Sequence, residues 1–393
     1  MKYIFIMVFI LNISSIIMSM LLNSKLGVLY GETTYNTMLG NIVYYSQLAV
    51  IFYYNFYVYN TLKINEIKKI FDFIVIFIII LGYMQIIIIY FPQISKIYDF
   101  FNLGNIIRDS SYILAINRIP LTCVEPASCG VLLGVLIIPY ILSCTLIKNK
   151  TNKYYILLIL IIPIAYWTKS STVYIAIFIN FFIYIIICII KKKNLYKLLI
   201  LSYIVIILIF SNIFIISCFN SNENIGVFET IKYYLVEKVN SDENLSTIHR
   251  KSTVINNLKI FKKYPLLGVG NGNQGFYYNE NLPQFAYKSP ETMKFYYGEK
   301  GVVSGGAFFT AFLSGYGTLG VVLIIIFIKK SINIISIIKN KLNGLQYMYF
   351  MGSITFLFLS TISADIVGDY ITIFVLSVPL INKDVKNLGG INE

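Results

Sequence analysis

The chain has 393 residues, of which 57% are hydrophobic and only 13% are charged. Its mean hydropathy is +0.73, and so little polar surface cannot cover a water-facing globule of this length. We therefore exclude a soluble enzyme and predict an all-α polytopic membrane protein that has the lipid bilayer as a partner. We attribute the formal net charge of +14 to membrane topology, so no nucleic-acid partner is expected.

Apolar runs that are long enough to cross a bilayer predict about ten transmembrane helices. The runs cover residues 3–22, 38–62, 71–91, 126–147, 153–168, 171–190, 197–219, 306–328, 345–363 and 366–382. Only Lys2 lies ahead of the first run, and no small-residue cleavage site follows it. We therefore interpret the first run as a retained anchor and not as a signal peptide.

Lysines and arginines gather in alternate short connections, and this alternation sets the predicted orientation of the helices. Because short translocated loops avoid Lys and Arg, both chain ends are predicted to be cytoplasmic. Residues 1–219 then form a membrane domain of seven helices. Residues 220–305 form one large extracytoplasmic loop that is partly helical. Residues 306–393 form three further membrane helices and a short cytoplasmic tail.

The sequence gives no support for metal or nucleotide chemistry. The five cysteines include no CxxC pair, and His249 is the single histidine, so a cluster of metal ligands is not expected. Residues 270–275 formally match GxGxxG, but no strand and crossover helix surround them. We interpret these glycines as a tight turn and predict no cofactor.

The segment from Arg118 to Ser128 leads into the fourth predicted helix at its outer end. Proline suits the first turn of a helix, so Pro126 is predicted to open this helix and to place Glu125 at or near its N-cap. The carboxylate there could take a proton from a sugar hydroxyl, with Arg118 nearby to hold an anion. The alternative is a capping glutamate paired with an interfacial arginine.

Residues 249–272, in the large loop, form the second candidate segment. A helix is predicted up to Pro265, with an apolar stripe at helical spacing. The stripe consists of Val254, Ile255, Leu258 and Phe261. Arg250 lies on the same stripe, so we expect it to point toward whatever the helix packs on, and we expect Asn257 to face water. A guanidinium in that place suits phosphate oxygens, and the alternative is a structural salt bridge.

Two short turns are predicted on the same outer face. Residues 168–172 connect the fifth and sixth predicted helices and place Lys169 at the membrane interface, where snorkelling is the alternative to a catalytic role. Asp365 and Asp369 lie in the turn between the last two predicted helices. An interfacial turn is the least costly place for such carboxylates, which could pair with the arginines or serve as the base.

At these residues the chain resembles the Wzy-type O-antigen and capsular polysaccharide polymerases and the related O-antigen ligases. The similar pieces are the segment from Arg118 to Ser128, the turn at Lys169, the segment from Arg250 to Gly270, and the helix entry from Gly306 to Gly320. The hydropathy layout, with one long external loop before the last helices, extends the resemblance over essentially the whole chain.

The resemblance implies an inverting transfer of glycan from an undecaprenyl pyrophosphate carrier, without metal or nucleotide. The reaction would take place on the outer side of the cytoplasmic membrane of a bacterium. In such proteins arginines of the external loops hold the pyrophosphate, which carries over to Arg118 and Arg250. Ligases commonly have His-Asn where this chain has Gly306-Ala307, so the resemblance favours a polymerase. A chain-length regulator and a flippase are partners that only the resemblance suggests.

These observations combine into one hypothesis: a polymerase that joins lipid-linked oligosaccharide repeat units into a capsule, exopolysaccharide or O-antigen chain. Its predicted catalytic residues are Glu125, Arg118 and Arg250, and its predicted substrate-binding residues are Lys169, His249, Asp365 and Asp369. The first alternative is a glycan ligase that transfers finished chains. The second is a flippase or transporter of the same lipid-linked glycan, which the lack of internal repeats disfavours.

Overall fold

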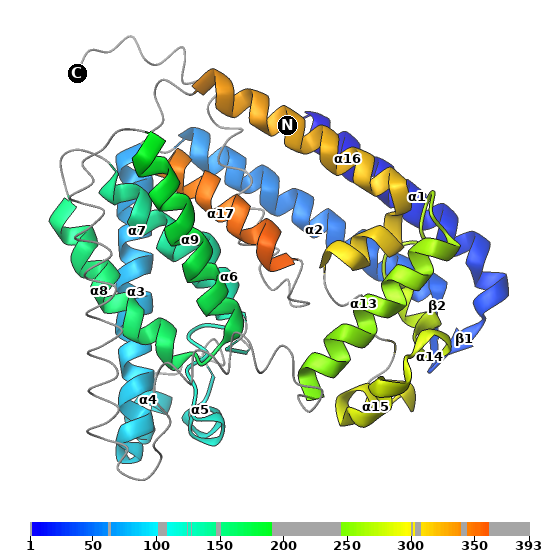
Figure 1. Cartoon of the computed structure of the whole chain (residues 1–393), viewed down its shortest axis with the longest axis horizontal. Coiled ribbons are helices and arrows are strands. Elements are labelled where there is room, and N and C mark those ends of the chain that lie inside the picture. The colour runs from blue at the N-terminus through cyan, green and yellow to red at the C-terminus, as the bar shows by residue number, and fades with distance from the viewer. Residues whose placement is uncertain are drawn as a thin grey trace. The chain divides into compact units, whose positions relative to one another are not determined.

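The computed structural model describes residues 2–61, 64–100, 108–123, 125–126, 128–146, 151–190, 245–299, 302, 308–338 and 344–360. Helices make up most of these residues (Figure 1). The predicted helices at 197–219 and 366–382 lie outside the described residues, as do Asp365 and Asp369. Each of the remaining predicted runs contains a described helix.

The chain divides into two compact units that do not follow the order of the sequence. Unit 1 consists of Met1–Tyr57, Lys238–Lys341 and Ser360–Glu393, and unit 2 consists of Val58–Glu237 and Leu342–Leu359. Each unit therefore combines segments from both halves of the chain.

Unit 1 starts with α1 (Lys2–Leu26), which a short hairpin connects to α2 (Thr34–Thr61). The strands β1 (Val28–Leu29) and β2 (Glu32–Thr33) pair antiparallel. Tyr30 and Gly31 between them have φ angles of 51° and 80°, and positive φ at both central residues is what the tightest hairpin turns require. The prediction of an all-α chain missed this hairpin because two-residue strands have no periodic signal.

The remaining elements of unit 1 come from the second half of the chain. They are α13 (Leu245–Lys263), η4 (Asn273–Tyr277), α14 (Tyr278–Asn281), η5 (Gln284–Lys288), α15 (Pro290–Tyr296) and α16 (Phe308–Ile338). The long helix α13 packs on α16, on η4 and on the short elements between them. Its C-terminal half shares an apolar core with α1, formed by Met18, Leu22, Ile260, Val269 and Tyr277.

The helix α16 is interrupted at Gly317, which has φ 61° and ψ −152°. A break leaves backbone groups without their helical partners, and the segment after α13 supplies new ones. Thr318 N donates to Pro265 O at 2.7 Å, and Val269 N donates to Ser314 O at 2.9 Å. Parallel bonds join Leu319 N to Leu266 O at 3.2 Å and Gly270 N to Gly315 O at 3.0 Å. The segment Pro265–Gly270 thus fixes the end of α13 against the break.

Unit 2 contains a group of helices that run side by side (Figure 1). They are α3 (Ile64–Tyr90), α7 (Ile138–Thr145), α8 (Thr151–Trp167) and α9 (Ser171–Ile190). The helix α7 continues α6 (Cys129–Val131) and the π-helical turn η2 (Leu132–Ile137). Three short elements, η1 (Pro92–Ile94), α4 (Ser95–Phe100) and α5 (Ser110–Ile116), follow α3, and α17 (Gly344–Ser360) completes the unit.

Small residues allow the helical stretch Cys129–Thr145 to approach α9 closely. A Cβ on Gly130 would lie 2.6 Å from Thr172 Oγ1, and a Cβ on Gly134 would overlap Ala176. Such small-residue contacts are the usual means of packing membrane helices. Pro139 has no N–H for the π-helical bond to Gly134 O, and the buried Asn180 donates to that carbonyl instead, at 2.7 Å. Asn180 therefore has a structural role in joining α9 to this stretch.

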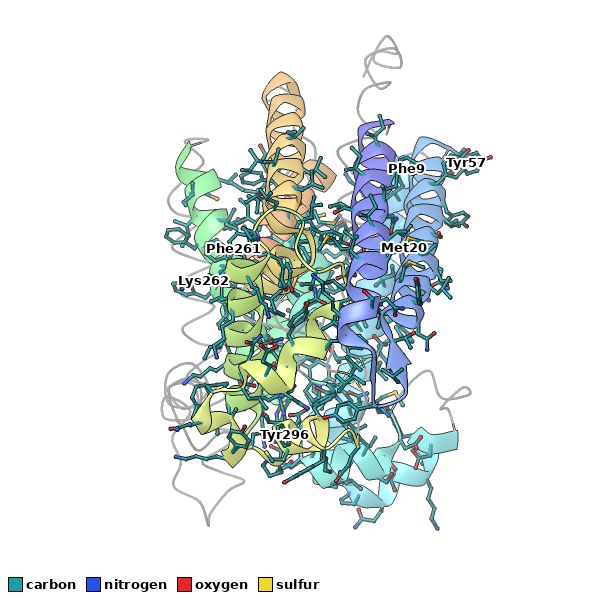
Figure 2. The ribbon with its side chains drawn as sticks, turned by 90° about the vertical axis from the view of Figure 1, so that its right-hand side faces the viewer. Phe9, Met20, Tyr57, Phe261, Lys262 and Tyr296 are labelled. Atoms are coloured by element: carbon teal, nitrogen blue, oxygen red, sulfur yellow. The ribbon has the colours of Figure 1, made fainter. Side chains whose placement is uncertain are left out.

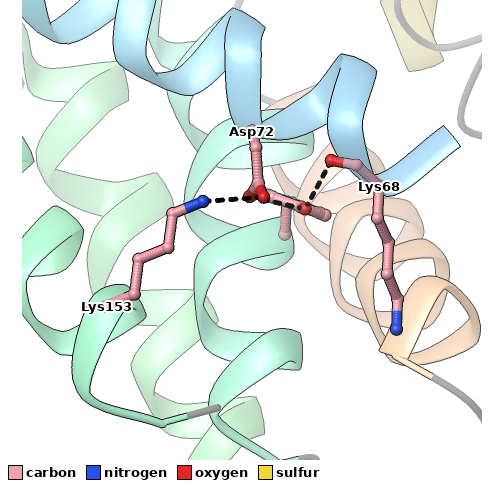
Figure 3. A network of polar contacts seen from close by, with 4 residues as sticks. Lys68, Asp72 and Lys153 are labelled. Atoms are coloured by element: carbon pink, nitrogen blue, oxygen red, sulfur yellow. Dashed lines mark hydrogen bonds and ion pairs between the residues drawn. The ribbon is translucent and has the colours of Figure 1, made fainter. Parts of the chain in front are cut away.

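A polar network joins three helices of unit 2 at one end (Figure 3). The carboxylate of Asp72 on α3 accepts from Lys153 Nζ at 2.8 Å and from Tyr140 Oη at 2.9 Å. The Tyr140 hydroxyl also donates to Lys68 O at 3.1 Å. Lys68 and Lys153 belong to segments that the charge pattern predicts to be cytoplasmic, so this network would mark the inner end of the unit.

Three helical stretches among the described residues are long and apolar enough to cross a membrane. They are Phe9–Leu26, Glu66–Tyr90 and Ser171–Cys188. Shorter apolar stretches cover Cys129–Thr145, Asn152–Trp167 and Thr310–Leu323. These helices are those of a membrane protein. The number of ten spans, the side of each terminus and the large extracytoplasmic loop stay predictions.

Candidate functional site

In unit 2, Arg118 binds the backbone of the predicted turn that contains Lys169. Its Nε donates to Thr168 O at 2.9 Å and its Nη2 donates to Lys169 O at 2.8 Å. These carbonyls follow the last residue of α8, where a helix leaves acceptors unpaired. Lys169 has φ 45°, and its Nζ lies 5.2 Å from the centre of the Trp167 ring. The structure thus brings Arg118 and Lys169 together, through the main chain of the turn.

Glu125 lies in a turn ahead of the helix, and its residue is exposed. Ser128 N donates to Glu125 O at 3.1 Å, and Cys129 N donates to Pro126 O at 3.3 Å. The helix starts at Cys129 with Ser128 as its N-cap, so the prediction that Pro126 opens it and that Glu125 caps it is wrong. Among the described residues, no ion pair joins Glu125 to Arg118, and the Glu125 carboxylate faces solvent.

Gln85 on α3 holds the segment between Arg118 and Glu125, and the sequence analysis did not find it. Its side-chain amide donates to Leu121 O at 3.1 Å and accepts from Leu121 N at 2.9 Å. Leu121 is buried with φ 52°, a conformation that needs such support in a residue with a Cβ. In the sequence, this role is indicated only by the position of Gln85 as a single polar residue in an apolar run, directly before Ile86 to Ile89.

In unit 1, His249 lies in a cluster of aromatic and hydroxyl side chains. Its Nδ1 is 3.2 Å from Tyr278 Oη and 3.3 Å from Thr292 Oγ1, and its ring stacks on Phe295 with centroids 5.1 Å apart. Tyr278 Oη also contacts Ser252 Oγ at 2.9 Å. Burial raises the pKa of Tyr278, so its hydroxyl keeps its proton at neutral pH. His249 is therefore held in a fixed orientation by residues from α14 and α15.

Arg250 follows His249 on α13 and is half-buried. Its backbone carbonyl accepts from Thr253 Oγ1 at 2.8 Å. Its guanidinium makes no hydrogen bond or ion pair with any residue that the structure describes, so the alternative of a structural salt bridge has no support there. A part-buried guanidinium without a counter-charge is a favourable place for an anion, because its planar fork matches phosphate oxygens.

The face on which α13 packs differs from the predicted one. The predicted stripe is half-buried at Val254, Ile255 and Phe261, and Leu258 is 46% exposed. The buried face carries Ser252, Thr253, Asn256 and Asn257 between Ile248 and Ile260. Asn257 bonds Thr310 and Ser314 of α16. The expectation that Asn257 faces water is therefore wrong, and the apolar stripe on which Arg250 was placed is not the buried face of the helix.

The glycine segment after α13 is a tight turn, as predicted. Gly268, Gly270 and Gly272 all have positive φ. Asn273 closes the turn by donating to Ser19 Oγ of α1 at 2.8 Å and to Val269 O at 2.9 Å. In the part of the chain that the structure describes, no three His, Cys, Asp or Glu side chains form a group that could hold a metal ion.

The segment from α8 to α15 carries Lys169, His249 and Arg250 and is the part of the chain with a known likeness. Residues 156–296 match the family model for O-antigen ligase. This match is consistent with the superfamily of Wzy-type O-antigen ligases and polymerases, which confirms the resemblance. The O-antigen ligase match covers just over a third of the chain, and Arg118 and Glu125 precede it. No curated protein and no solved structure gives a significant match.

Proposed function

We propose that this protein polymerises undecaprenyl-pyrophosphate-linked oligosaccharide repeat units on the outer face of a bacterial cytoplasmic membrane. An activity of the O-antigen ligase or polymerase type is supported by the family match of residues 156–296. The single observation that carries the proposal is the half-buried guanidinium of Arg250 inside the matched segment, which has no hydrogen bond or ion pair with a residue that the structure describes. The products would be capsule, exopolysaccharide or O-antigen chains.

The proposed reaction is an inverting glycosyl transfer that needs no metal. A hydroxyl oxygen of the acceptor forms a bond to the anomeric carbon of the donor sugar. The bond from that carbon to the pyrophosphate oxygen breaks, and the lipid pyrophosphate leaves with the electron pair. A base takes the hydroxyl proton. The protein must therefore supply charge stabilisation for the leaving group and one proton acceptor.

Arg250 is proposed to bind the pyrophosphate and to stabilise its increasing negative charge. Its planar guanidinium can donate two parallel N–H bonds to phosphate oxygens. His249 is proposed to bind substrate beside it, because the contacts of its Nδ1 with Tyr278 and Thr292 fix the direction in which the ring points.

Glu125 is proposed as the proton acceptor, because it is exposed and its carboxylate makes no hydrogen bond or ion pair with a described residue. Asp365 and Asp369 stay candidates for the same role or for substrate binding. Lys169 is proposed to bind substrate at the turn that Arg118 holds. The remaining N–H groups of Arg118 are free for an anion, since only Nε and Nη2 bond carbonyls among the described residues.

A ligase is the second candidate, and the description of the matched family favours it directly. The two reactions share a donor and differ in the acceptor. A polymerase adds repeat units to another lipid-linked chain, whereas a ligase transfers a finished chain to a different lipid or protein acceptor.

The test uses the full chain in lipid nanodiscs with undecaprenyl-pyrophosphate-linked repeat units as the only substrate. A ladder of regularly spaced products on a gel supports the polymerase. Transfer that occurs only after a separate glycolipid acceptor is added would establish the ligase instead. Movement of unchanged substrate to the other leaflet of a vesicle, without new glycosidic bonds, would establish a flippase. A chain-length regulator and a flippase as partners stay expectations.

A further inference from the structure

The side of α13 that faces away from its packing partners is apolar. Leu258 is 46% exposed, and Val254, Ile255 and Phe261 are half-buried. Figure 2 shows Phe261 and Lys262 on the side of α13 that points away from α1. The apolar surface continues past Pro265 to Leu266, which is 72% exposed, and to Leu267. In water such an apolar strip is unfavourable, so it requires an apolar partner.

The helix α13 is also strongly basic. The helix carries Arg250, Lys251, Lys259, Lys262 and Lys263 and contains no acidic residue. Three of the lysines lie in the last turns, beside the exposed leucines. Lys262 is exposed and has no described partner. Among the residues in the described ranges, Lys259 bonds a neutral carbonyl, that of Asn281. Lys263 is opposed by one acid, the largely exposed Glu280 at 3.7 Å. A net positive charge next to apolar side chains fits an anionic, partly apolar partner.

The C-terminal end of α13 is joined to a segment that can cross a membrane. Ile260 and Val269 pack on Met18 and Leu22, which lie within the apolar stretch Phe9–Leu26 of α1. Asn271 N donates to Ser15 Oγ at 2.9 Å, deeper in the same stretch. The irregular backbone of Gly268–Gly270 is buried by α1 and α16, as irregular backbone at membrane depth must be. Leu266 and Leu267 are thus held beside apolar membrane helices.

We propose that the segment from Leu258 to Leu267 docks into the surface of an anionic lipid leaflet. Leu258, Phe261, Leu266 and Leu267 would contact acyl chains, while Lys259 and Lys262 would reach the lipid phosphates. A leaflet supplies both parts of the observed surface at once, an apolar layer and a layer of negative charge at its edge. The docked segment is continuous with the bilayer that surrounds α1. This proposal is independent of the enzymatic activity.

The test measures contact between a tryptophan and brominated acyl chains, which quench its fluorescence. Trp167 is the single tryptophan, so Trp167→Phe provides the background for the full chain in nanodiscs. Leu266→Trp is compared with Tyr297→Trp, because Tyr297 is exposed to a similar degree, 67%, at the end of α15 in the same unit. We expect brominated lipid to reduce the Leu266→Trp emission several-fold and to leave Tyr297→Trp nearly unchanged.

The charge requirement is tested in mixed bilayers in which either the phosphatidylglycerol or the phosphatidylcholine is brominated. We expect the anionic lipid to quench Leu266→Trp more strongly than the neutral one does, and Lys259→Gln with Lys262→Gln to remove the difference. If both lipids quench Leu266→Trp equally while Lys259 and Lys262 are still present, the segment does not prefer anionic lipid, and that part of the proposal is overturned. Quenching of Leu266→Trp that does not exceed that of Tyr297→Trp would overturn the docking itself and indicate a protein partner.

If Trp167→Phe does not fold, spin labels on Leu266→Cys and Tyr297→Cys replace the tryptophans, with unsubstituted protein labelled in parallel as the blank. The described cysteines, Cys123, Cys129, Cys144 and Cys188, are buried. A docked Leu266→Cys label is more accessible to dissolved oxygen than to a water-soluble nickel complex. The reverse order at that position would contradict the proposal.

Discussion

Arg118 Nη2 donates to the main-chain carbonyl of Lys169 at 2.8 Å, and Nε of the same side chain donates to Thr168 O at 2.9 Å. Arg118 thus bonds the backbone at the C-terminal end of α8, which is far from it in the sequence. The guanidinium acts on the backbone of the turn, so it sets the position of Lys169. An anion-binding role for Arg118 would add to this structural one.

Arg118→Ala is expected to lower the free energy of unfolding by about 1–3 kcal/mol, because it leaves two carbonyls without donors. Arg118→Lys keeps the charge but cannot bond both carbonyls with a planar fork, so we expect an intermediate loss. Thermal unfolding in detergent measures stability, and glycan transfer measures activity. If Arg118→Lys restored full activity while stability stayed at the level of Arg118→Ala, Arg118 would act through its charge and not through the turn.

Gly268 lies against the break in α16, with φ 67°, where an added Cβ would overlap the backbone of Ser314 and Gly315. Gly268→Ala combines left-handed strain with that overlap, so we expect a loss of about 2–5 kcal/mol in stability. Gly27→Ala is the matched control, because Gly27 has φ 63° and open space around its Cα. It should lose only the strain, about 1–2 kcal/mol. Equal losses for both variants would contradict the close approach.

Tyr98 on α4 is expected to contribute to the pH dependence of stability. Its hydroxyl accepts from Gln85 Nε2 at 2.9 Å and donates to Arg108 O at 3.2 Å. Burial raises the pKa of Tyr98 from 10.0 to about 12. Between these pH values the unfolded chain has lost the proton and the folded chain retains it, so stability falls as pH rises. The contribution of Tyr98 is complete below pH 10 and is lost by about pH 12.

Tyr98→Phe removes this contribution. The stability difference between unsubstituted protein and Tyr98→Phe should be constant up to about pH 10 and should shrink toward pH 12. Tyr297→Phe, at an exposed tyrosine, is expected to show no such change. Unfolding temperatures measured across this range check the prediction, and a difference that grows with pH would exclude the assigned direction of the pKa.

The apolar runs predicted the positions of most described helices, because membrane depth imposes length and hydropathy on each span. The orientation of α13 could not be predicted in the same way. Its apolar stripe, with Leu258 and Phe261, was taken as the packing face, as it would be in a soluble protein. The buried face is polar instead, at Ser252 and Asn256. A helix next to a bilayer can turn its apolar side outward, and hydropathy alone does not distinguish the two cases.

The candidate site was predicted in part for a related reason. The predicted topology placed Arg118 and Lys169 on the same outer face, and the structure brings them together. The left-handed backbone of Leu121 is held by Gln85, which is distant from it in the chain. A tertiary contact of this kind leaves no local pattern. Asp365 and Asp369 lie outside the described residues, so their role stays a prediction.

Arg250 differs from Arg118 in having no described partner, and this difference gives opposite expectations for the two residues. Arg250→Ala should reduce glycan transfer by about 100-fold or more, since it removes a donor from the leaving pyrophosphate. Its unfolding temperature and its amount in the membrane should stay unchanged, because no side-chain bond to a described residue is lost. Lys294→Ala, at an exposed cation on α15, is the matched control and should keep full activity.

The intermediate variant Arg250→Lys separates charge from geometry at the same position. A lysine retains the positive charge but offers a point charge where phosphate oxygens are met best by a planar fork. We therefore expect activity between that of Arg250→Ala and that of the unsubstituted protein, with the loss concentrated in turnover and not in KM. Products of unchanged length and amount from Arg250→Ala would remove Arg250 from the reaction.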